Sequence, residues 1–335
     1  MNFPRKRILA ILVVSSLLCF QGFAAGEREP SVDLPGTGDS ADEEVPGRYP
    51  LEMEDDTGHT VRLDRKPQRI ISLTAFTDDI LLDLVDHSRL IGVTHLSEDP
   101  AISNVVNKIA DIPNKLTMNV EVILSLQPDL VFVANWSQAD IVAQLRDAGI
   151  SVFLIATGLS IPAIQEKTKI VAQLVDATDE AEAMIGQMDE RLSAVRSKLS
   201  VLPEAQRRTV LDYATLGSAQ GEGSSWDEII RHAGLINSAG EFPVDEWGQV
   251  PLSKEKILEL DPDLLILPGW VYGDPAGAEA FYEQTVGDPA LRGLTAIREG
   301  RVYQMPEGLK AATSQYVVDA VEYLARLAYP KLFSE

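Results

Sequence analysis

Cysteine is almost absent from this chain of 335 residues, because Cys19 is the only one. A single cysteine cannot form an intrachain disulfide. Cys19 also lies inside an apolar run near the N-terminus, so the body of the chain has no thiol for nucleophilic catalysis or thiolate metal ligation. Only 4 histidines occur, and their spacing is not that of a metal site. The composition therefore argues against a thiol enzyme and against a resident metal.

Positive charge is also scarce. The chain has 29 Lys and Arg residues against 51 Asp and Glu, which gives a formal net charge of −22. Such a surface repels nucleic acid and disfavours anionic membranes. The same charge keeps a protein soluble. We therefore expect no nucleic-acid partner.

Catalytic motifs are missing as well. The sequence contains neither the Gly-x-Ser-x-Gly elbow of hydrolases nor the His-Glu-x-x-His pair of zinc proteases. The Gly- and Ser-rich segment 217–225 lacks the lysine of a phosphate-binding loop and carries Glu222, which would repel phosphate. We expect it to be a plain loop. The sequence predicts no catalytic residue, no metal site and no cofactor.

The first 25 residues are predicted to be a signal peptide. Residues 5–7 are basic, residues 8–20 form an apolar run too short to span a bilayer, and mostly small residues follow at 22–26. This layout predicts export across the inner membrane to the periplasm or beyond. Lipid attachment at Cys19 is an open alternative, although Leu18 stands where a lipoprotein signal prefers a small residue.

Residues 26–48 are predicted to be a disordered acidic linker. They combine Gly, Pro and Ser with Asp and Glu and contain almost no large apolar side chains. Such a composition cannot bury enough apolar surface to fold. The folded part is therefore expected to begin near residue 49.

A sixteen-residue pattern occurs twice, at 118–133 and 252–267, with seven identical positions. Each copy begins with a good helix N-cap, Asn119 or Ser253, and continues as a short apolar helix. A Pro-Asp pair then ends the helix, because proline moves the preceding residue out of the right-handed helical region. A buried strand follows. One repeat pair predicts two similar lobes rather than a solenoid.

Strands and helices alternate on both sides of a purely helical middle. We expect an N-terminal lobe at 49–160, connecting helices at 161–200 and a C-terminal lobe at 201–335. Residues 178–199 carry one continuous apolar stripe and predict a helix roughly 33 Å long. The predicted fold class is α/β, with two Rossmann-like lobes joined by one long rigid helix and a ligand cleft between the lobes.

The sequence resembles the substrate-binding proteins of ABC importers, in particular the class with a helical spine that binds ferric siderophores, haem and cobalamin. The resemblance covers roughly residues 50–335. It is carried by the segments Arg69–Leu73, Leu90–Val93, Met118–Val131, Leu145–Ile150 and Trp226–Leu235. It implies a monomeric, non-enzymatic protein that captures a small-molecule metal chelate, a cobalamin-like corrinoid or a ferric siderophore. It also implies delivery to an ABC permease with its ATPase.

Other functions of the same architecture stay open at this point. They are haem binding, binding of a free metal ion and a sensor role without transport. A free-ion site normally draws His and carboxylate ligands from both lobes, and the few histidines of this chain give that interpretation little support.

The resemblance assigns permease docking to one glutamate on each lobe, which here are Glu121 and Glu255. Each occupies the same position of its repeat. Local physics offers a simpler reason for an acid at this position, since the first turn of a helix favours negative charge by about 0.3–1 kcal/mol. Equal placement in both lobes favours docking.

Ligand contacts are expected in loops that follow the strands, where open α/β sheets bind their ligands. Aromatic side chains there can stack on a flat chelate. The candidates are Trp136, Trp270, Tyr272, Trp247, Tyr213, Thr74 and His95. Basic residues are scarce in these loops, with Lys115 and Lys310 as the only obvious candidates, so a neutral or weakly charged chelate is favoured.

Overall fold

The computed structural model describes residues 48–245 and 248–334. The predicted signal peptide with Cys19, the predicted linker up to residue 47, and Trp247 lie outside the described residues. What the sequence predicts for them therefore stays a prediction. Within the two described ranges, no helix is both long enough and apolar enough to cross a membrane.

The first lobe is built around a parallel sheet of five strands. Its strands are β3 (Ile70–Ser72), β4 (Leu90–Thr94), β5 (Lys115–Leu116), β6 (Leu130–Ala134) and β7 (Val152–Ile155). Their order is β5-β4-β3-β6-β7. Every residue of β4, β6 and β7 is buried, as expected for apolar strands covered on both faces.

Helices and short segments complete the first lobe. They are the hairpin β1 (Leu51–Glu54) and β2 (Thr60–Leu63), the helices α1 (Ala75–Leu84), α2 (Val120–Ser125) and α3 (Ala139–Asp147), and the 3-10 turns η1 (His87–Arg89) and η2 (His95–Glu98). The hydroxyl of Thr74 caps α1 by accepting a hydrogen bond from the backbone N–H of Thr77 at 3.0 Å. Helix α1 is almost wholly buried, and its apolar side chains pack into the same core as those of β3 and β4.

The second lobe contains a parallel sheet of four strands in the order β10-β8-β12-β13. These are β8 (Thr209–Asp212), β10 (Ile236–Asn237), β12 (Leu264–Pro268) and β13 (Val302–Met305). Beside them, β9 (Ser218–Gln220) pairs antiparallel with β11 (Gln249–Pro251). The expectation of a plain loop at 217–225 was therefore wrong: β9 lies inside it, and it ends at the first turn of a helix.

Seven helices and one 3-10 turn of the described chain surround the second sheet or follow it. They are η3 (Glu204–Gln206), α6 (Ser225–His232), α7 (Lys254–Leu260), α8 (Gly277–Gly287), α9 (Thr295–Arg298), α10 (Glu307–Lys310), α11 (Val317–Ala328) and α12 (Pro330–Phe333). Helices α6 and α11 both have clear apolar faces. The sequence does not predict α8, whose apolar and polar residues are mixed around the helix.

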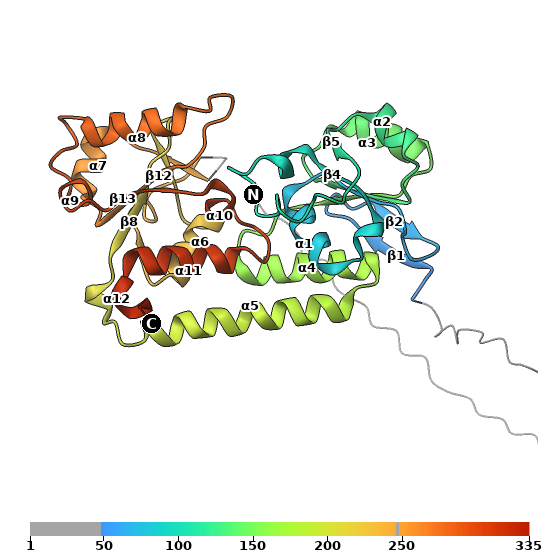
Figure 1. Cartoon of the computed structure of the whole chain (residues 1–335), viewed down its shortest axis with the longest axis horizontal. Helices are drawn as coiled ribbons and strands as arrows, with labels where there is room; N and C mark the ends of the chain where they lie inside the picture. The colour runs from blue at the N-terminus through green and yellow to red at the C-terminus, as the bar shows by residue number, and fades with distance from the viewer. Residues whose placement is uncertain (1–47, 246–247, 335) are drawn as a thin grey trace, which may run out of the picture. The chain divides into compact units, whose positions relative to one another are not determined.

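Two helices connect the lobes, α4 (Ile161–Val175) and α5 (Thr178–Leu199), and they lie side by side (Figure 1). Helix α5 has the bounds that the apolar stripe predicts. Between the two helices, Asp176 has a φ of 55°, in the left-handed region, which lets the chain reverse.

Both connecting helices belong to the cores of both lobes. Ile164 of α4 packs in the core of the second lobe, while Val171 of the same helix packs in that of the first. In α5 the order is reversed, with Ala181 in the first core and Leu192 in the second. The α/β fold class with a long linking helix is thus confirmed, with the addition that α4 runs antiparallel beside that helix.

The repeated pattern forms the same local structure twice. Asn119 accepts a hydrogen bond from the N–H of Val122 at 3.1 Å, and Ser253 accepts one from that of Lys256 at 3.2 Å. Helices α2 and α7 begin at these caps, and the buried strands β6 and β12 follow them. The predicted unit of cap, helix and buried strand is therefore present in both lobes.

Each Pro-Asp pair of the repeat has two structural roles, one at the residue before the proline and one at the aspartate. The residue before each proline, Gln127 or Asp261, has a φ of 49° or 37° and so leaves the right-handed helix through the left-handed region. The aspartate after it holds the neighbouring strand. Asp129 accepts from the N–H of Arg69 at 2.9 Å just before β3, and Asp263 accepts from that of Thr209 at 2.9 Å in β8. These identities of the repeat serve the fold.

Candidate ligand cleft

A cavity lies where carboxyl ends of strands from both lobes come together. Its volume is about 660 Å³, and it is lined by Asp99 and Ala101 of the first lobe and by residues 269–275 of the second. Asp99 follows β4 through the turn η2, and residue 269 follows β12 directly. We call this space the aromatic cavity. Its position agrees with the rule that open α/β sheets bind ligands at the carboxyl ends of their strands.

A smaller cavity of about 240 Å³ adjoins the same wall. We call it the inner cavity. The segment 96–104 contributes residues to both cavities. Opposite it, the second lobe supplies Glu307, Gly308 and residues 311–313, from α10 and the loop after it. Residues of both lobes line each cavity, and we call the two cavities together the cleft.

Two aromatic side chains dominate the larger cavity. The rings of Trp270 and Tyr272 are 5.8 Å apart and meet edge to face at 74°. Tyr272 is 86% exposed, so this surface has no protein cover. Gly269 holds the loop close to β13, since a Cβ there would lie 2.4 Å from the carbonyl oxygen of Met305. The arrangement offers an edge and a face on which a flat ligand can stack.

The cleft carries carboxylates but no cation among its described lining residues. In the aromatic cavity, Asp99 and Asp274 each accept a hydrogen bond in their own turn, from the N–H of Ala101 at 2.9 Å and from that of Ala276 at 3.1 Å. Among the hydrogen bonds of the described residues, each engages only one of its two carboxylate oxygens. Such a lining repels anions and favours a neutral or cationic ligand.

The two lysines that the sequence offers for the ligand are engaged elsewhere. The amino group of Lys115 donates to the carbonyl oxygens of Ile109 and Ile112 at 2.9 and 2.6 Å. Lys310 is only 5% exposed, and its amino group lies 3.0 Å from a carboxylate oxygen of Asp212. The interpretation of Lys310 as a cation available to a ligand was wrong, because Asp212 neutralises it inside the second lobe.

Asp79 of α1 joins the lobes beside the inner cavity. The Ser314 hydroxyl of the second lobe donates to its carboxylate at 2.6 Å, and the Asn104 amide donates at 3.3 Å. The same Asn104 amide donates to the carbonyl oxygen of Gly308 at 2.9 Å. Burial raises the pKa of Asp79 to about 6, although these donors oppose the change. A carboxyl group with that pKa is partly protonated in mildly acidic surroundings.

Asp79→Asn is expected to stabilise the protein at neutral pH. An acid whose pKa rises from 3.8 to about 6 on folding makes stability fall as pH rises through that interval, because the native state binds more protons than the unfolded state. Asparagine keeps an acceptor for Ser314 and removes this loss. In urea unfolding at pH 7.5, the free energy of unfolding of the variant should exceed that of the wild type by about 1–3 kcal/mol. Near pH 4 the two proteins should be equally stable.

Asp83→Asn is the matched control for this prediction. Asp83 lies one turn later on α1 and is about one-third exposed, and it pairs with Lys108 at 2.6 Å. Its replacement should give no gain at neutral pH. A loss of stability in Asp79→Asn at pH 7.5 would show that the ionised carboxylate is the favoured form in the folded protein.

The remaining predicted ligand residues lie outside the described lining of the two cavities. Trp136 follows β6 and is 82% exposed, and His95 is exposed after β4 with its ring Nδ1 3.2 Å from the carbonyl oxygen of Leu116. Thr74 caps α1. Tyr213 is buried, and its ring lies 5.4 Å from that of Phe281. Their contact with a ligand stays a prediction.

Sequence reasoning missed the first-lobe wall of the cleft. Asp99, Ile102 and Asn104 come from an irregular segment after η2, without a motif or an aromatic side chain. The one available signal was position, because this segment follows the carboxyl end of a buried strand, as Trp270 does in the second lobe.

The predicted docking residues are both accessible. Glu121 and Glu255 are exposed in the first turns of α2 and α7. Hydrogen bonds from its own backbone N–H and from Ser253 lower the pKa of Glu255, which keeps it ionised at neutral pH. Nothing in the local structure of either residue buries it.

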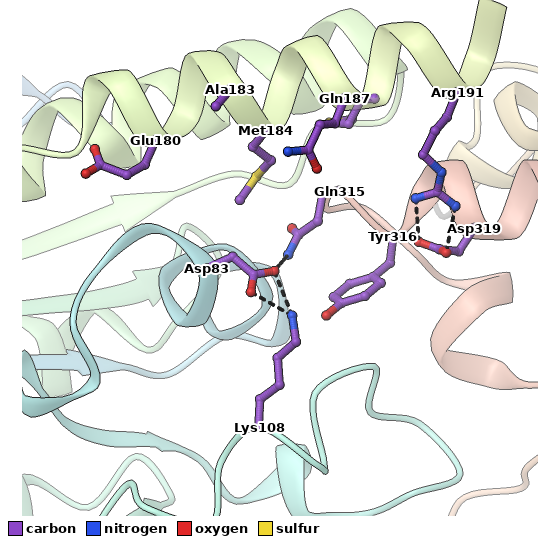
Figure 2. A pocket seen from close by; sticks show the side chains of 11 residues that line it. Asp83, Lys108, Glu180, Ala183, Met184, Gln187, Arg191, Gln315, Tyr316 and Asp319 are labelled. Atoms are coloured by element: carbon purple, nitrogen blue, oxygen red, sulfur yellow. Dashed lines mark hydrogen bonds and ion pairs between the residues drawn. The ribbon is translucent and has the colours of Figure 1, made fainter. Parts of the chain in front are cut away.

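A third cavity, of about 550 Å³, lies among α1, α5 and α11, away from the strand ends (Figure 2). Four of its five charged lining residues form two ion pairs, and the fifth is Glu180. Lys108 contacts Asp83 at 2.6 Å, and Arg191 contacts Asp319 at 2.8 Å. We therefore regard it as part of the packing between lobes and connecting helix. In the described part of the chain, no group of three or more His, Cys, Asp or Glu residues could hold a metal ion.

Two α/β lobes held by paired helices, with a cavity where their strand ends meet, define a two-lobed ligand-binding protein. The chain belongs to the periplasmic binding protein family, whose sequence profile matches residues 70–309. The predicted resemblance is thereby confirmed. The family consists of transport components, so the protein is not an enzyme.

Relatives point to the same class. The chain is 23% identical over 293 residues to an uncharacterized ABC transporter substrate-binding lipoprotein of Bacillus subtilis, YvrC, covering 86% of this chain and 88% of that protein. It is 27% identical over 259 residues to a cobalamin-binding protein of Halobacterium salinarum, covering 77% of this chain and 68% of that protein.

A solved structure confirms the architecture. The fold is similar to that of the molybdate-binding protein MolA of Haemophilus influenzae, with a TM-score of 0.68 at 19% identity, covering 84% of this chain and 92% of that one. Together with the family, these similarities make the protein a substrate-binding protein of ABC importers, a class that works with a membrane permease and an ATPase.

Proposed function

We propose that the protein captures a neutral or weakly charged metal chelate, foremost a cobalamin-like corrinoid, and delivers it to an ABC permease. The observation that carries this proposal is the aromatic cavity, in which Trp270 and Tyr272 face a space lined by carboxylates and without a described cation. The similarity to a cobalamin-binding protein supports the same ligand class.

Electrostatics separates the candidate ligands. A small oxyanion, a citrate complex or a triply charged catecholate chelate needs cations or helix N-termini around it, because burying an unpaired anion is costly. The carboxylates Asp99 and Asp274 act in the opposite direction. A ferric hydroxamate siderophore is neutral and is the second candidate that this charge pattern favours.

The volume of the cleft fits a ligand that is only partly enclosed. The aromatic cavity of about 660 Å³ falls within the usual range of small-molecule sites, roughly 300–1,000 Å³. A corrinoid is larger than this space, so part of it would project beyond the two aromatic rings. The protein would act as an exported monomer, with residues 1–25 as its leader, and dock through Glu121 and Glu255.

Calorimetry of the protein without its first 47 residues tests the ligand. The panel is cyanocobalamin, a ferric hydroxamate, haemin, a ferric catecholate, ferric citrate and molybdate. Cyanocobalamin is expected to bind with a Kd below about 1 µM, or about −8 kcal/mol. Tryptophan fluorescence should be quenched, and Trp270→Phe should lose most of the quenching. Tight binding of molybdate or of the catecholate, with none of cyanocobalamin, would overturn the proposal.

A further inference from the structure

Several exposed large apolar side chains lie just after the carboxyl ends of parallel strands. Eleven are exposed in the described chain, and five of them follow the carboxyl end of a parallel strand within four residues. These five are Leu96 after β4, Trp136 after β6, Leu159 after β7, Leu216 after β8 and Tyr272 after β12. The segments after these strands make up a small share of the chain, so the clustering is not what scattered surface residues produce.

Two of the five are continuous with the cleft. Leu96 lines the inner cavity and Tyr272 lines the aromatic cavity. Leu216 and Leu159 follow strands of the same two sheets. Leu216 is 93% exposed four residues after β8, whose last residue, Asp212, pairs with Lys310 of α10 beside the inner cavity.

Leu159 lies where the chain passes from one lobe to the other. It is 54% exposed, and it follows β7 of the first lobe. Two residues later, the N–H of Ile161 donates to the Glu228 carboxylate of the second lobe at 3.1 Å. The loop that carries Leu159 is therefore held against both lobes.

We infer that Leu159 and Leu216 extend the binding surface beyond the two cavities and select a ligand with broad apolar faces, such as a macrocyclic chelate. The inference rests on the proposed function and adds to it two residues that determine ligand specificity. A ligand larger than the aromatic cavity projects from it, and apolar groups at other strand ends of the same two sheets are the surface that it meets. Strand β8 is the direct neighbour of β12, and β7 lies at the edge of the first sheet. Burying one leucine against such a ligand contributes about 1–2 kcal/mol, or roughly five- to thirty-fold in affinity.

The test compares Leu159→Ser, Leu216→Ser and the double variant with Val201→Ser. Val201 is 70% exposed but follows α5 rather than a strand, so it controls for the loss of an exposed apolar side chain. Each single variant should weaken cyanocobalamin binding at least fivefold in calorimetry, and the double variant more. Val201→Ser should stay within twofold of the wild type. All four should keep the wild-type melting temperature, because the replaced side chains are exposed.

A second measurement does not depend on corrinoid binding. Nile red is neutral and brightens on apolar surfaces, and its fluorescence with the wild type should exceed that with the double variant severalfold. Equal Nile red fluorescence in the two proteins overturns the inference. Unchanged chelate affinity in the double variant also overturns the inference, provided that Trp270→Ala weakens binding in the same assay. Normal chelate affinity with lost uptake would assign Leu159 and Leu216 to a contact with the permease. Absence of cyanocobalamin binding in the wild type counts against the proposed function, while the Nile red result still decides the inference.

Discussion

Lys310→Met is expected to lower the free energy of unfolding by about 3–5 kcal/mol, because it leaves a buried carboxylate without its counter-charge. Lys310 is 5% exposed and Asp212 is 2% exposed, with 3.0 Å between amino nitrogen and carboxylate oxygen. Asp212 retains one donor, the N–H of Gln220 at 2.8 Å. One backbone hydrogen bond cannot replace a full positive charge in the interior.

Lys310 stays protonated at and around neutral pH. Burial alone lowers the pKa of a lysine, but the neighbouring Asp212 and Glu307 carboxylates override burial and leave the pKa of Lys310 raised above 10.5. A raised pKa on a basic group contributes stability that is present below the unfolded value and is lost as pH rises through the folded value. The contribution of the pair should therefore be constant near neutrality and fall only above about pH 10.5.

Urea unfolding at pH 7.5 measures the effect. The double variant Lys310→Met with Asp212→Leu should recover part of the loss, because the buried Asp212 charge is removed while Glu307 still lacks the nearby cation. Lys256→Met is the matched control. Lys256 is about one-third exposed and pairs with Glu259 at 3.1 Å on the surface of α7, so its replacement should cost less than about 1 kcal/mol. A loss below about 1 kcal/mol in Lys310→Met would show that water reaches the pair.

Elements with strong local signals could be predicted from the sequence. The buried strands β6 and β12 are continuous apolar runs, and the caps Asn119 and Ser253 and the Pro-Asp pairs limit the helices before them. Helix α5 has an uninterrupted apolar stripe over its full length. Short elements of mixed composition, such as β9 and α8, have no comparable signal, and they were missed.

The cleft depends on contacts between residues far apart in the chain, and such contacts leave no local pattern. Asp79 and Ser314 are separated by 235 positions and meet only because α1 packs beside the loop before α11. Lys310 looks like a free basic residue in the sequence, and only the position of β8 shows that Asp212 neutralises it. The position of Trp270 and Tyr272 beside the aromatic cavity could be predicted, because the fold class places residues that follow a buried strand at the ligand edge of the sheet. The same signal selects Trp136, which lies outside the described lining, and contact of these residues with a ligand stays a prediction.

Replacing both Glu121 and Glu255 by glutamine is expected to reduce uptake of the chelate more than tenfold and to leave chelate affinity within twofold of the wild type. The two residues occupy the same position of the repeat, in the first turns of α2 and α7, and both are exposed. Glutamine preserves size and helix propensity and removes only the charge. A partner with cationic side chains would lose both of its charge-assisted contacts, and such contacts are about twice as strong as neutral ones.

Uptake in cells that depend on this protein, together with calorimetry of the purified variants, separates docking from ligand binding. Glu259→Gln is the matched control, because Glu259 is exposed one turn after Glu255 on the same helix. It should transport normally. Each single variant should retain part of the uptake, since the other lobe still docks. Full uptake in the double variant would mean that these glutamates only stabilise the first turns of their helices, and the repeat would then reflect the fold alone.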